Sequence, residues 1–476
     1  MRLTLDRIAS VTEGTRHGAA GTAVDGFAND SRVIRPGECF VAIESEAASD
    51  DGPDGHDFVA HAFERGAAAA LVTRIPEGVG GPLIVVADVF DALGALARSA
   101  RTQELADARV VGITGSTGKT STKDLLEAAL APARGVVANA ASFNNEIGLP
   151  ITLLGAGIDR EFVICEMGAR FEGNIASLCA IARPDVGVVT NIGPAHVEHL
   201  GGIAGVERVK GELLDAVPAS GLVVLNADDP ATLRLRVRTS ARVITAGIAT
   251  SADVCIVRAV TGSDLRAEVE FDTPWGAVRA VLGLRGAHQV SNAALAAAAA
   301  LDAGVAPDAV AAGLQAAQGS SWRMDLTETG AGILVLNDAY NANPQSMAAA
   351  LRAFGDLPVS GRRHAVLGEM RELGSAAEAA HTEIGLQCAR HRIDVLVAVG
   401  HGAALDALTD AARSEGVAVR RVEHPDAARA ELDLSRGDAV LVKASRAVGL
   451  ESVAISLVSE LGARPATATT EGAAAR

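Results

Sequence analysis

The chain has 476 residues, which at roughly 150 residues per domain suggests about three domains. It carries 42 basic side chains (Lys and Arg) and 58 acidic ones (Asp and Glu), so its formal net charge is −16. Such an acidic chain is a poor candidate for nucleic-acid binding, because phosphate backbones bind to basic surfaces. A single nucleotide bound at a local site is compatible with this charge.

The sequence also argues against a membrane span and against disulfides. Its longest apolar run, residues 293–301, is far shorter than the ~20 residues that cross a bilayer, and the N-terminus lacks the apolar core of a signal peptide. The cysteines are odd in number, scattered and without a C-x-x-C pair. We therefore expect free thiols in a cytoplasmic protein, with no structural zinc site.

Residues 1–105 are expected to form a first unit, with short strands at 39–43 and 83–86 and a helix over 58–71. A second unit, 106–318, opens with a β-rich run from residue 108. Its further strands are predicted at 162–166, 186–191 and 222–226, with helix-length segments between them. This alternation predicts a parallel sheet with helices on both faces.

Between about 241 and 285 the pattern changes to antiparallel hairpin strands, which we interpret as a β insertion before a helix near His288. A third unit, 319–462, is again expected to be doubly wound. Its strands are predicted at 333–337, 364–367, 395–399 and 439–443. The low-complexity tail, 463–476, is predicted to be disordered. The fold class is therefore α/β.

The segment Thr114–Ser121, between a strand and a helical run, is the strongest local signal for chemistry. Its glycines allow several N–H groups to point inward at the start of a helix, where Lys119 can reach terminal phosphates and Thr120 can bind Mg²⁺. Residue 113 is Ile where the full phosphate-loop motif has Gly. The alternative is a glycine-rich turn with an incidental lysine.

We consider three further residues as candidates for chemistry near this loop. Glu166 ends a predicted strand and can bind Mg²⁺, although a solvated acid at a strand end would look the same. His196 follows a Gly-Pro turn, and with His199 it has the spacing of a zinc pair, but a third ligand is not evident and a surface histidine is the commoner case. From spacing alone, Lys210 is predicted to be a surface lysine on a helix.

The segment Asn337–Pro344 opens the third unit with an unusual density of polar side chains, including the only Tyr of the chain. Turn formation explains part of this composition, and ligand contact explains the rest better. Gly400 and Gly402 resemble the start of a dinucleotide motif, but residue 405 is Leu and no acidic strand end follows. We reject a dinucleotide site there.

Together these segments resemble the Mur ligase family over about residues 30–451. The resemblance also rests on other short segments: 30–32, 54–58, 144–150, 226–230, 286–293, 367–374 and 442–446. The sequence departs from the family pattern at Gln289, Glu369 and Ala444, and between residues 43 and 54. The phosphate loop is shared with folylpolyglutamate synthases, whereas Asn337–Pro344 is specific to the member of the family that adds a dipeptide.

The resemblance implies three domains: an N-terminal domain that binds a UDP-linked substrate, a central phosphate-loop ATPase domain and a C-terminal Rossmann-like domain. It implies that ATP phosphorylates the carboxylate of UDP-N-acetylmuramoyl-tripeptide, and that the amine of D-alanyl-D-alanine then attacks the acyl phosphate. The expected enzyme takes part in cytoplasmic peptidoglycan precursor synthesis, acts as a monomer and needs ATP and Mg²⁺.

The resemblance also implies roles for individual residues. ATP would be held by Gly115, Ser116, Thr117, Gly118, Lys119, Thr120 and Ser121. The bound nucleotide would be covered by a second set of residues: Asn292, Arg323 and Asp338. Mg²⁺ would be held by Thr120, Glu166 and His196. Substrate would contact Ser31 and Arg32 at the uridine end and, near the reacting groups, Asn144, Asn145 and Asn341. The catalytic set would be Lys119, Glu166, His196 and Lys210.

Lys210 aligns with a lysine that is carbamylated in several Mur ligases. A free lysine with a pKa near 10.4 is neutral only about once in 10³ at pH 7, so the site must favour the carbamate, for example by pairing it with Mg²⁺. We hold this carbamate as a hypothesis.

Two alternatives remain at this point. One is another ligase of the superfamily, either a Mur ligase that adds a single amino acid or a folylpolyglutamate synthase; Asn337–Pro344 argues against it. The other is a nucleotide-dependent switch without ligase activity, which leaves the combination of Glu166, His196 and Lys210 unexplained.

Overall fold

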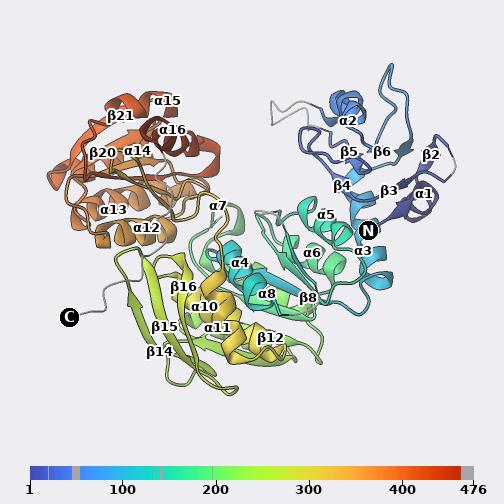
Figure 1. The fold of residues 1–476 in the computed structure, drawn as a ribbon, viewed down its shortest axis with the longest axis horizontal. Coiled ribbons are helices and arrows are strands. Elements are labelled where there is room, and N and C mark those ends of the chain that lie inside the picture. Colours follow the sequence, from blue (N-terminus) through green and yellow to red (C-terminus); the bar gives the residue numbers. More distant parts are fainter. Residues whose placement is uncertain (20, 45–53, 133–134, 140–142, 196, 463–476) are drawn as a thin grey trace, which may run out of the picture.

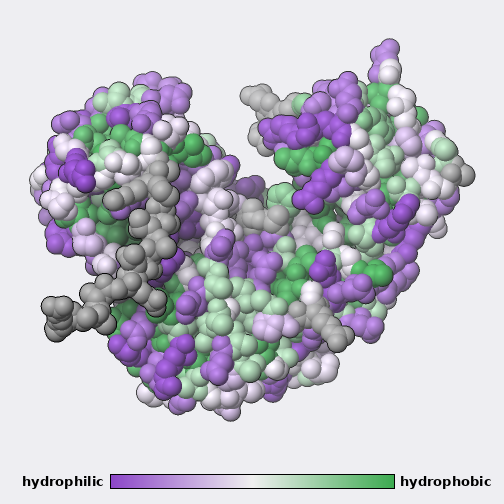
Figure 2. Space-filling model, viewed as in Figure 1, coloured by the Kyte–Doolittle hydropathy of each residue, from purple (hydrophilic) through white to green (hydrophobic). Residues whose placement is uncertain are grey.

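A computed structural model describes residues 1–19, 21–44, 54–132, 135–139, 143–195 and 197–462. Its three larger sheets follow one another along the chain, and Figure 1 shows them as three bodies in an arc, with the first and the last on either side of the middle one. The space-filling view shows a deep hollow between the two outer bodies (Figure 2). Within the described ranges, no helix is long and apolar enough to cross a membrane.

The first body is a five-stranded sheet in the order β2-β7-β6-β5-β4 with a small two-stranded sheet, β1-β3, beside it. The strands are β1 (Leu3–Thr4), β2 (Thr15–His17), β3 (Ala23–Val24), β4 (Phe27–Ala28), β5 (Cys39–Val41), β6 (Ala69–Val72) and β7 (Leu83–Val85). The helices are α1 (Leu5–Thr12), α2 (Val59–Glu64) and α3 (Val89–Gln103). The predicted helix over 58–71 is wrong beyond Glu64. Gly66 turns the chain at a φ of +97°, and the fully buried 69–72 forms an inner strand instead.

The middle body is built on a nine-stranded sheet in the order β16-β15-β14-β13-β12-β11-β8-β10-β9. Its parallel part comprises β8 (Arg109–Thr114), β9 (Val136–Ala138), β10 (Phe162–Glu166), β11 (Val186–Val189), β12 (Leu222–Asn226) and β13 (Arg242–Gly247). The expected β insertion is not separate from this sheet. Strand β14 (Val254–Thr261) pairs in parallel with β13, and β15 (Arg266–Asp272) and β16 (Val278–Arg285) extend the same sheet as an antiparallel meander.

Helices cover both faces of this sheet, which explains why its inner strands are apolar on both sides. One core lies between the sheet and α3, α5 (Gly148–Gly155), α6 (Asn174–Ala182) and α8 (Ile203–Ala216). The other lies beneath α4 (Lys119–Ala129), α10 (Gln289–Asp302) and α11 (Pro307–Ala316). Two short helices complete the body, α7 (Val197–Leu200) and α9 (Pro230–Arg234).

The third body has a six-stranded sheet in the order β17-β18-β22-β19-β20-β21, parallel except for the edge strand β17. The strands are β17 (Asp325–Glu328), β18 (Leu334–Asn337), β19 (Arg363–Gly368), β20 (Val395–Val399), β21 (Ala418–Val422) and β22 (Ala439–Lys443). One face is covered by α12 (Pro344–Asp356), α13 (Ala377–Arg390) and α14 (Ala403–Ser414), and the other by α15 (Pro425–Ala428) and α16 (Glu451–Leu461). The predicted doubly wound arrangement is confirmed, whereas the two edge strands, β17 and β21, were not predicted.

The carboxyl ends of the parallel strands position the candidate site. In the middle sheet β8 lies between β10 and β11, and Glu166 and Val189 pair with the last two residues of β8. In the third sheet β18 and β22 are neighbours, so the segments that follow Asn337 and Lys443 start side by side. Ligands of open α/β sheets bind at such edges.

Candidate active site

The phosphate loop connects β8 to α4 and requires glycine at two positions. Gly115 and Gly118 have φ angles of +146° and +79°. A Cβ on Gly118 would lie 2.5 Å from the Asn292 Oδ1, and one on Gly115 would lie 1.9 Å from the Thr190 Oγ1. Only glycine combines this conformation with such a close approach. The loop therefore follows the path that its sequence predicts, with its N–H groups at the start of α4.

Two side chains brace this loop. Lys119 Nζ donates to the carbonyl of Gly115 at 2.8 Å. Asn191, which follows β11, accepts from the N–H of Thr117 at 3.1 Å and donates to its Oγ1 at 2.8 Å. Sequence reasoning did not single out Asn191, although it stands at the end of a strand like Glu166. These bonds fix the conformation of the loop at the carboxyl edge of the sheet.

Glu166 lies beside the loop as a buried carboxylate, 1% exposed. It accepts hydrogen bonds from Thr120 Oγ1 and Asn144 Nδ2, both at 2.7 Å. Its own N–H donates to Asn139 Oδ1 at 2.8 Å, which fixes the end of β10. The alternative of a solvated acid is wrong for Glu166.

The carboxylate and hydroxyl of this pair are oxygen donors of the kind that Mg²⁺ prefers. Within the described ranges, no group of three or more His, Cys, Asp or Glu residues could hold a metal ion. A Mg²⁺ ion here would therefore complete its coordination with phosphate oxygens and water, as it commonly does. The third expected ligand, His196, lies outside the described residues.

Lys210 on α8 is buried, at 2% exposure, so its prediction as a surface lysine is wrong. Burial lowers its pKa from 10.5 to about 7. The nearby ammonium of Lys119 lowers this pKa further, and the carboxylates of Glu166 and Glu212 oppose the shift. Burial also lowers the pKa of Lys119, with Arg323 adding to the effect and Glu166 opposing it. These groups therefore form one electrostatic cluster beneath the loop.

The third body contributes a second polar cluster. Lys443 Nζ, at the end of β22, lies 2.6 Å from Asp338 Oδ2 and 2.8 Å from the carbonyl of Asn341. Two arginines lie over aromatic rings: Arg323 is 4.1 Å from the Tyr340 ring centroid, and Arg446 is 4.6 Å from that of Trp322. The buried Arg323 Nε makes no hydrogen bond within the described structure. A guanidinium with an unused N–H donor can bind an anionic ligand.

A cavity of about 1130 Å³ lies between the two clusters. It brings together most of the predicted site residues: Ser116, Thr117, Gly118, Lys119, Thr120, Ser121, Asn144, Asn145, Glu166, Asn292, Arg323, Asp338 and Asn341. Tyr340, from the predicted ligand-contact segment, also lines it, together with residues that the prediction had not included: Asn191, Gln289, Lys443 and Arg446. Gly115 shapes the loop from behind, and Lys210 does not line the cavity.

Two predicted residues lie elsewhere. Ser31 and Arg32 belong to the first body, and neither lines this cavity. Ser31 is buried and its Oγ lies 3.0 Å from the Nδ1 of His61. Arg32 is mostly exposed and pairs with Asp30 at 2.7 Å. The structure therefore does not bring them together with the other predicted residues.

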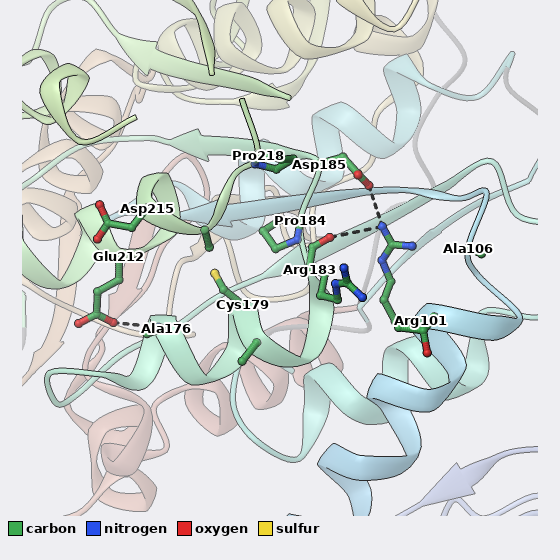
Figure 3. A pocket seen from close by; sticks show the side chains of 13 residues that line it. Arg101, Ala106, Ala176, Cys179, Arg183, Pro184, Asp185, Glu212, Asp215 and Pro218 are labelled. Atoms are coloured by element: carbon green, nitrogen blue, oxygen red, sulfur yellow. Dashed lines mark hydrogen bonds and ion pairs between the residues drawn. The ribbon is translucent and has the colours of Figure 1, made fainter. Parts of the chain in front are cut away.

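A second cavity, of about 660 Å³, lies at the opposite ends of the same strands, between α3, α6 and α8 (Figure 3). Several of its charged groups are bonded within the protein. Arg101 pairs with Asp185 at 3.0 Å, and Glu212 accepts from the N–H of Ala176 at 2.9 Å (Figure 3). The length of β8 separates it from the phosphate loop. We therefore place the chemistry in the larger cavity.

Comparisons with known proteins show the family of the chain. A profile of the Mur ligase middle domain matches residues 113–300, and a profile of the Mur ligase glutamate ligase domain matches residues 322–446. UDP-N-acetylmuramoyl-tripeptide–D-alanyl-D-alanine ligase of Mycobacterium tuberculosis is 40% identical, over 97% of this chain and 98% of the relative.

Two solved structures are similar over nearly the whole chain. A crystal structure of MurF from Acinetobacter baumannii has a TM-score of 0.81 and 28% identity, covering 96% of this chain and 99% of its own. MurF ligase from Thermotoga maritima in complex with ADP has a TM-score of 0.75 and 28% identity, covering 92% and 98%.

Proposed function

The chain belongs to the Mur ligase family, and from this premise we propose that it is an ATP-dependent ligase that joins D-alanyl-D-alanine to UDP-N-acetylmuramoyl-tripeptide. The observation that carries the proposal is the composition of the cavity: the phosphate loop and Glu166 line one side, and the Asn337–Pro344 segment lines the other. ATP and the dipeptide that accepts the acyl group would therefore bind in the same cavity. The product is a lengthened precursor of peptidoglycan.

The first step joins the tripeptide carboxylate to the γ-phosphorus of ATP and releases ADP. Because phosphoryl transfer depends on positioning and on neutralising charge, the N–H groups of the loop and the ammonium of Lys119 stabilise the transferring group. Thr120 and Glu166, with His196 as a third candidate, would hold Mg²⁺. When bound, Mg²⁺ supplies charge neutralisation between the phosphates.

In the second step the neutral amine of D-alanyl-D-alanine attacks the acyl carbon, the C–N bond forms, and inorganic phosphate leaves with one oxygen of the original carboxylate. The amine nitrogen gives up a proton, which balances the charge of the departing phosphate as hydrogen phosphate. The guanidinium groups of Arg323 and Arg446 face the cavity, where they can balance the negative charge of phosphate as it leaves. Asn292 and Asp338 would close on the nucleotide.

We also propose that Lys210 reacts with CO₂ to form a carbamate. The neutral Nζ attacks the carbon of CO₂, an N–C bond forms and a proton is released. The pKa of about 7 supports this reaction, because a large part of the amine is then neutral at pH 7. The modification would turn a buried cation next to Lys119 into an anion and would favour Mg²⁺ nearby.

The remaining assignments extend the same proposal. Ser31 and Arg32 would face the uridine end of the substrate, and Asn144, Asn145 and Asn341 would contact its reacting end. The domains would comprise residues 1–105, 106–318 and 319–462. The enzyme would act as a monomer in the cytoplasm, which fits its free cysteines.

A substrate panel tests the function. Phosphate release from ATP is measured with UDP-N-acetylmuramoyl-tripeptide and either D-alanyl-D-alanine, single amino acids or glutamate, and the product mass is recorded. We expect turnover with the dipeptide. Turnover only with a single amino acid would identify a different ligase of the superfamily, and ATP binding without acyl transfer would identify a switch.

A further inference from the structure

The segment that links the middle body to the third body is bonded to the phosphate-loop helix. This linker, residues 317–324, runs from the end of α11 to the start of β17. Within it, the N–H of Ser320 donates to Asp124 Oδ2 at 2.9 Å, and Ser320 Oγ donates to both carboxylate oxygens at 3.1 and 2.9 Å. Asp124 is 8% exposed and lies on α4, which begins at Lys119. A single carboxylate therefore joins the nucleotide helix to the linker.

A buried carboxylate in a helix is costly unless it is bonded, so its partners indicate why it is there. Besides Ser320, the partner of Asp124 is the ammonium of Lys123, 3.0 Å from Oδ1. An apolar side chain could fill the same space, but it could not accept the N–H of Ser320. Asp124 therefore does two things that an apolar side chain could not: it balances the charge of the buried Lys123 ammonium, and it holds the linker through Ser320.

The part of the linker beyond Ser320 has an unusual backbone. Trp322 and Met324 adopt φ angles of +61° and +52°, in the left-handed region that side chains with a Cβ rarely occupy. Such a conformation persists only where the surroundings enforce it. On the side of the third body, the N–H of Tyr340 donates to Trp322 O at 3.1 Å, and the N–H of Met324 donates to Asp338 Oδ1 at 3.0 Å.

Arg323 lies between these two left-handed residues, and its guanidinium lies over Tyr340 at the wall of the large cavity. We propose that Asp124 is a positioning residue: it clamps the linker to the phosphate-loop helix, so that the strained arm 320–324 presents Arg323 to the nucleotide. The inference rests on the proposed function and adds a residue that touches neither substrate nor nucleotide.

Chain geometry explains how the clamp would act. An extended chain reaches about 3.5 Å per residue, so Arg323 can move at most about 10 Å from an anchored Ser320. Without the anchor, the nearest fixed point is the end of α11 near Ala317, and the reach becomes about 20 Å. The clamp thus restricts the positions that Arg323 can reach relative to α4. It also makes the position of Arg323 depend on α4, the helix that holds the phosphates.

The test uses the full-length protein and two substitutions, Asp124→Leu, which removes both acceptor oxygens, and Ser320→Ala, each with a matched control. Glu127→Gln changes an exposed acid on the same helix, and Ser320→Thr keeps both the hydroxyl and the N–H. Three quantities are measured: hydrogen exchange of the amides in 320–326, affinity for ADP, and kcat with all substrates saturating. The first two require no turnover, so they remain decisive if the proposed reaction is wrong.

For Asp124→Leu we expect arm amides that exchange on the order of tenfold faster and a kcat lower on the order of tenfold, because a displaced catalytic group costs rate. Affinity for ADP should stay within about threefold, since the loop itself is intact. Ser320→Ala should shift exchange and kcat in the same direction, and both controls should match the parent.

Unchanged exchange of the arm in a folded Asp124→Leu variant would overturn the proposal. So would a parallel loss of kcat, ADP affinity and melting temperature, because that pattern indicates only a damaged helix. If Asp124→Leu does not fold, Ser320→Ala, which removes the two hydroxyl bonds to Asp124, decides alone: parent-like exchange and kcat in that variant would overturn the proposal equally.

Discussion

Replacing Lys210 by methionine should abolish a CO₂-dependent part of the activity. The chain places every lysine it has, Lys119, Lys123, Lys210 and Lys443, in the middle and third bodies near the site, and Lys210 is among the most buried. With its pKa at about 7, about half of its amine is neutral at pH 7, against about one part in 3000 for a pKa of 10.5. Burial thus raises the reactive fraction about a thousandfold.

The direction of the pH dependence follows from the same shift. Only the neutral amine reacts with CO₂, and the folded-state pKa lies below the ordinary one, so the carbamate forms above about pH 7 and is lost as the pH falls through that value. Activity that depends on added bicarbonate should therefore decline below about pH 7. Methionine keeps the length and apolar stem of the side chain, so packing is largely retained.

Two measurements check this prediction. In the presence of ¹³C-bicarbonate, the parent protein should show a carbamate carbon signal by NMR that is absent in Lys210→Met and present in Lys123→Met. The kcat of Lys210→Met should fall by roughly 10² or more, because the carbamate that would favour Mg²⁺ near the transferring phosphoryl group is then absent. A normal kcat in Lys210→Met, or a signal that survives the substitution, would refute the reasoning.

Three further substitutions follow from the site. Lys119→Ala should lower kcat by roughly 10² or more, because it removes a charge aimed at the transferring phosphoryl group; near-normal steady-state turnover would contradict that role. Gly118→Ala places a Cβ 2.5 Å from the Asn292 Oδ1 at a φ of +79°, so ATP affinity measured by calorimetry should fall at least about tenfold. Gly155→Ala, where a Cβ meets nothing within 4 Å, is its control and should bind normally. Asp338→Asn leaves the buried Lys443 ammonium without its counter-charge and should destabilise the third body by about 3 kcal/mol, seen as a lower melting temperature; an unchanged melting temperature would show that the pair is not buried in solution.

The inner strands were predictable from sequence, and the edge strands were not. Strands β10, β12, β20 and β22 have the predicted bounds, because buried parallel strands are short continuous apolar runs. Strand β17 has the sequence Asp-Leu-Thr-Glu and β21 contains two arginines, since an edge strand is half solvated and its pattern resembles a loop. The strands after residue 241 were recognised, but the hairpin pattern did not reveal that β14 pairs in parallel with β13, with Ala246 opposite Val254 and Gly247 opposite Cys255, and so joins the main sheet.

The site was predictable where local sequence fixes local geometry. The phosphate loop needs glycines at set positions, and Glu166 follows directly from a strand, so both could be found. The burial of Lys210 depends on how α8 packs against the sheet, and helix periodicity alone did not reveal it. The clamp between Asp124 and Ser320 joins residues 196 positions apart, a separation at which a single sequence carries no signal.

The fate of the carboxylate oxygens tests the central claim most directly. UDP-N-acetylmuramoyl-tripeptide labelled with ¹⁸O in its terminal carboxylate is turned over with ATP and D-alanyl-D-alanine, and the released phosphate is analysed by ³¹P NMR. If ATP activates the carboxylate as an acyl phosphate, each phosphate carries one ¹⁸O and the new amide keeps the other. Unlabelled phosphate, released alongside the lengthened precursor, would contradict the account.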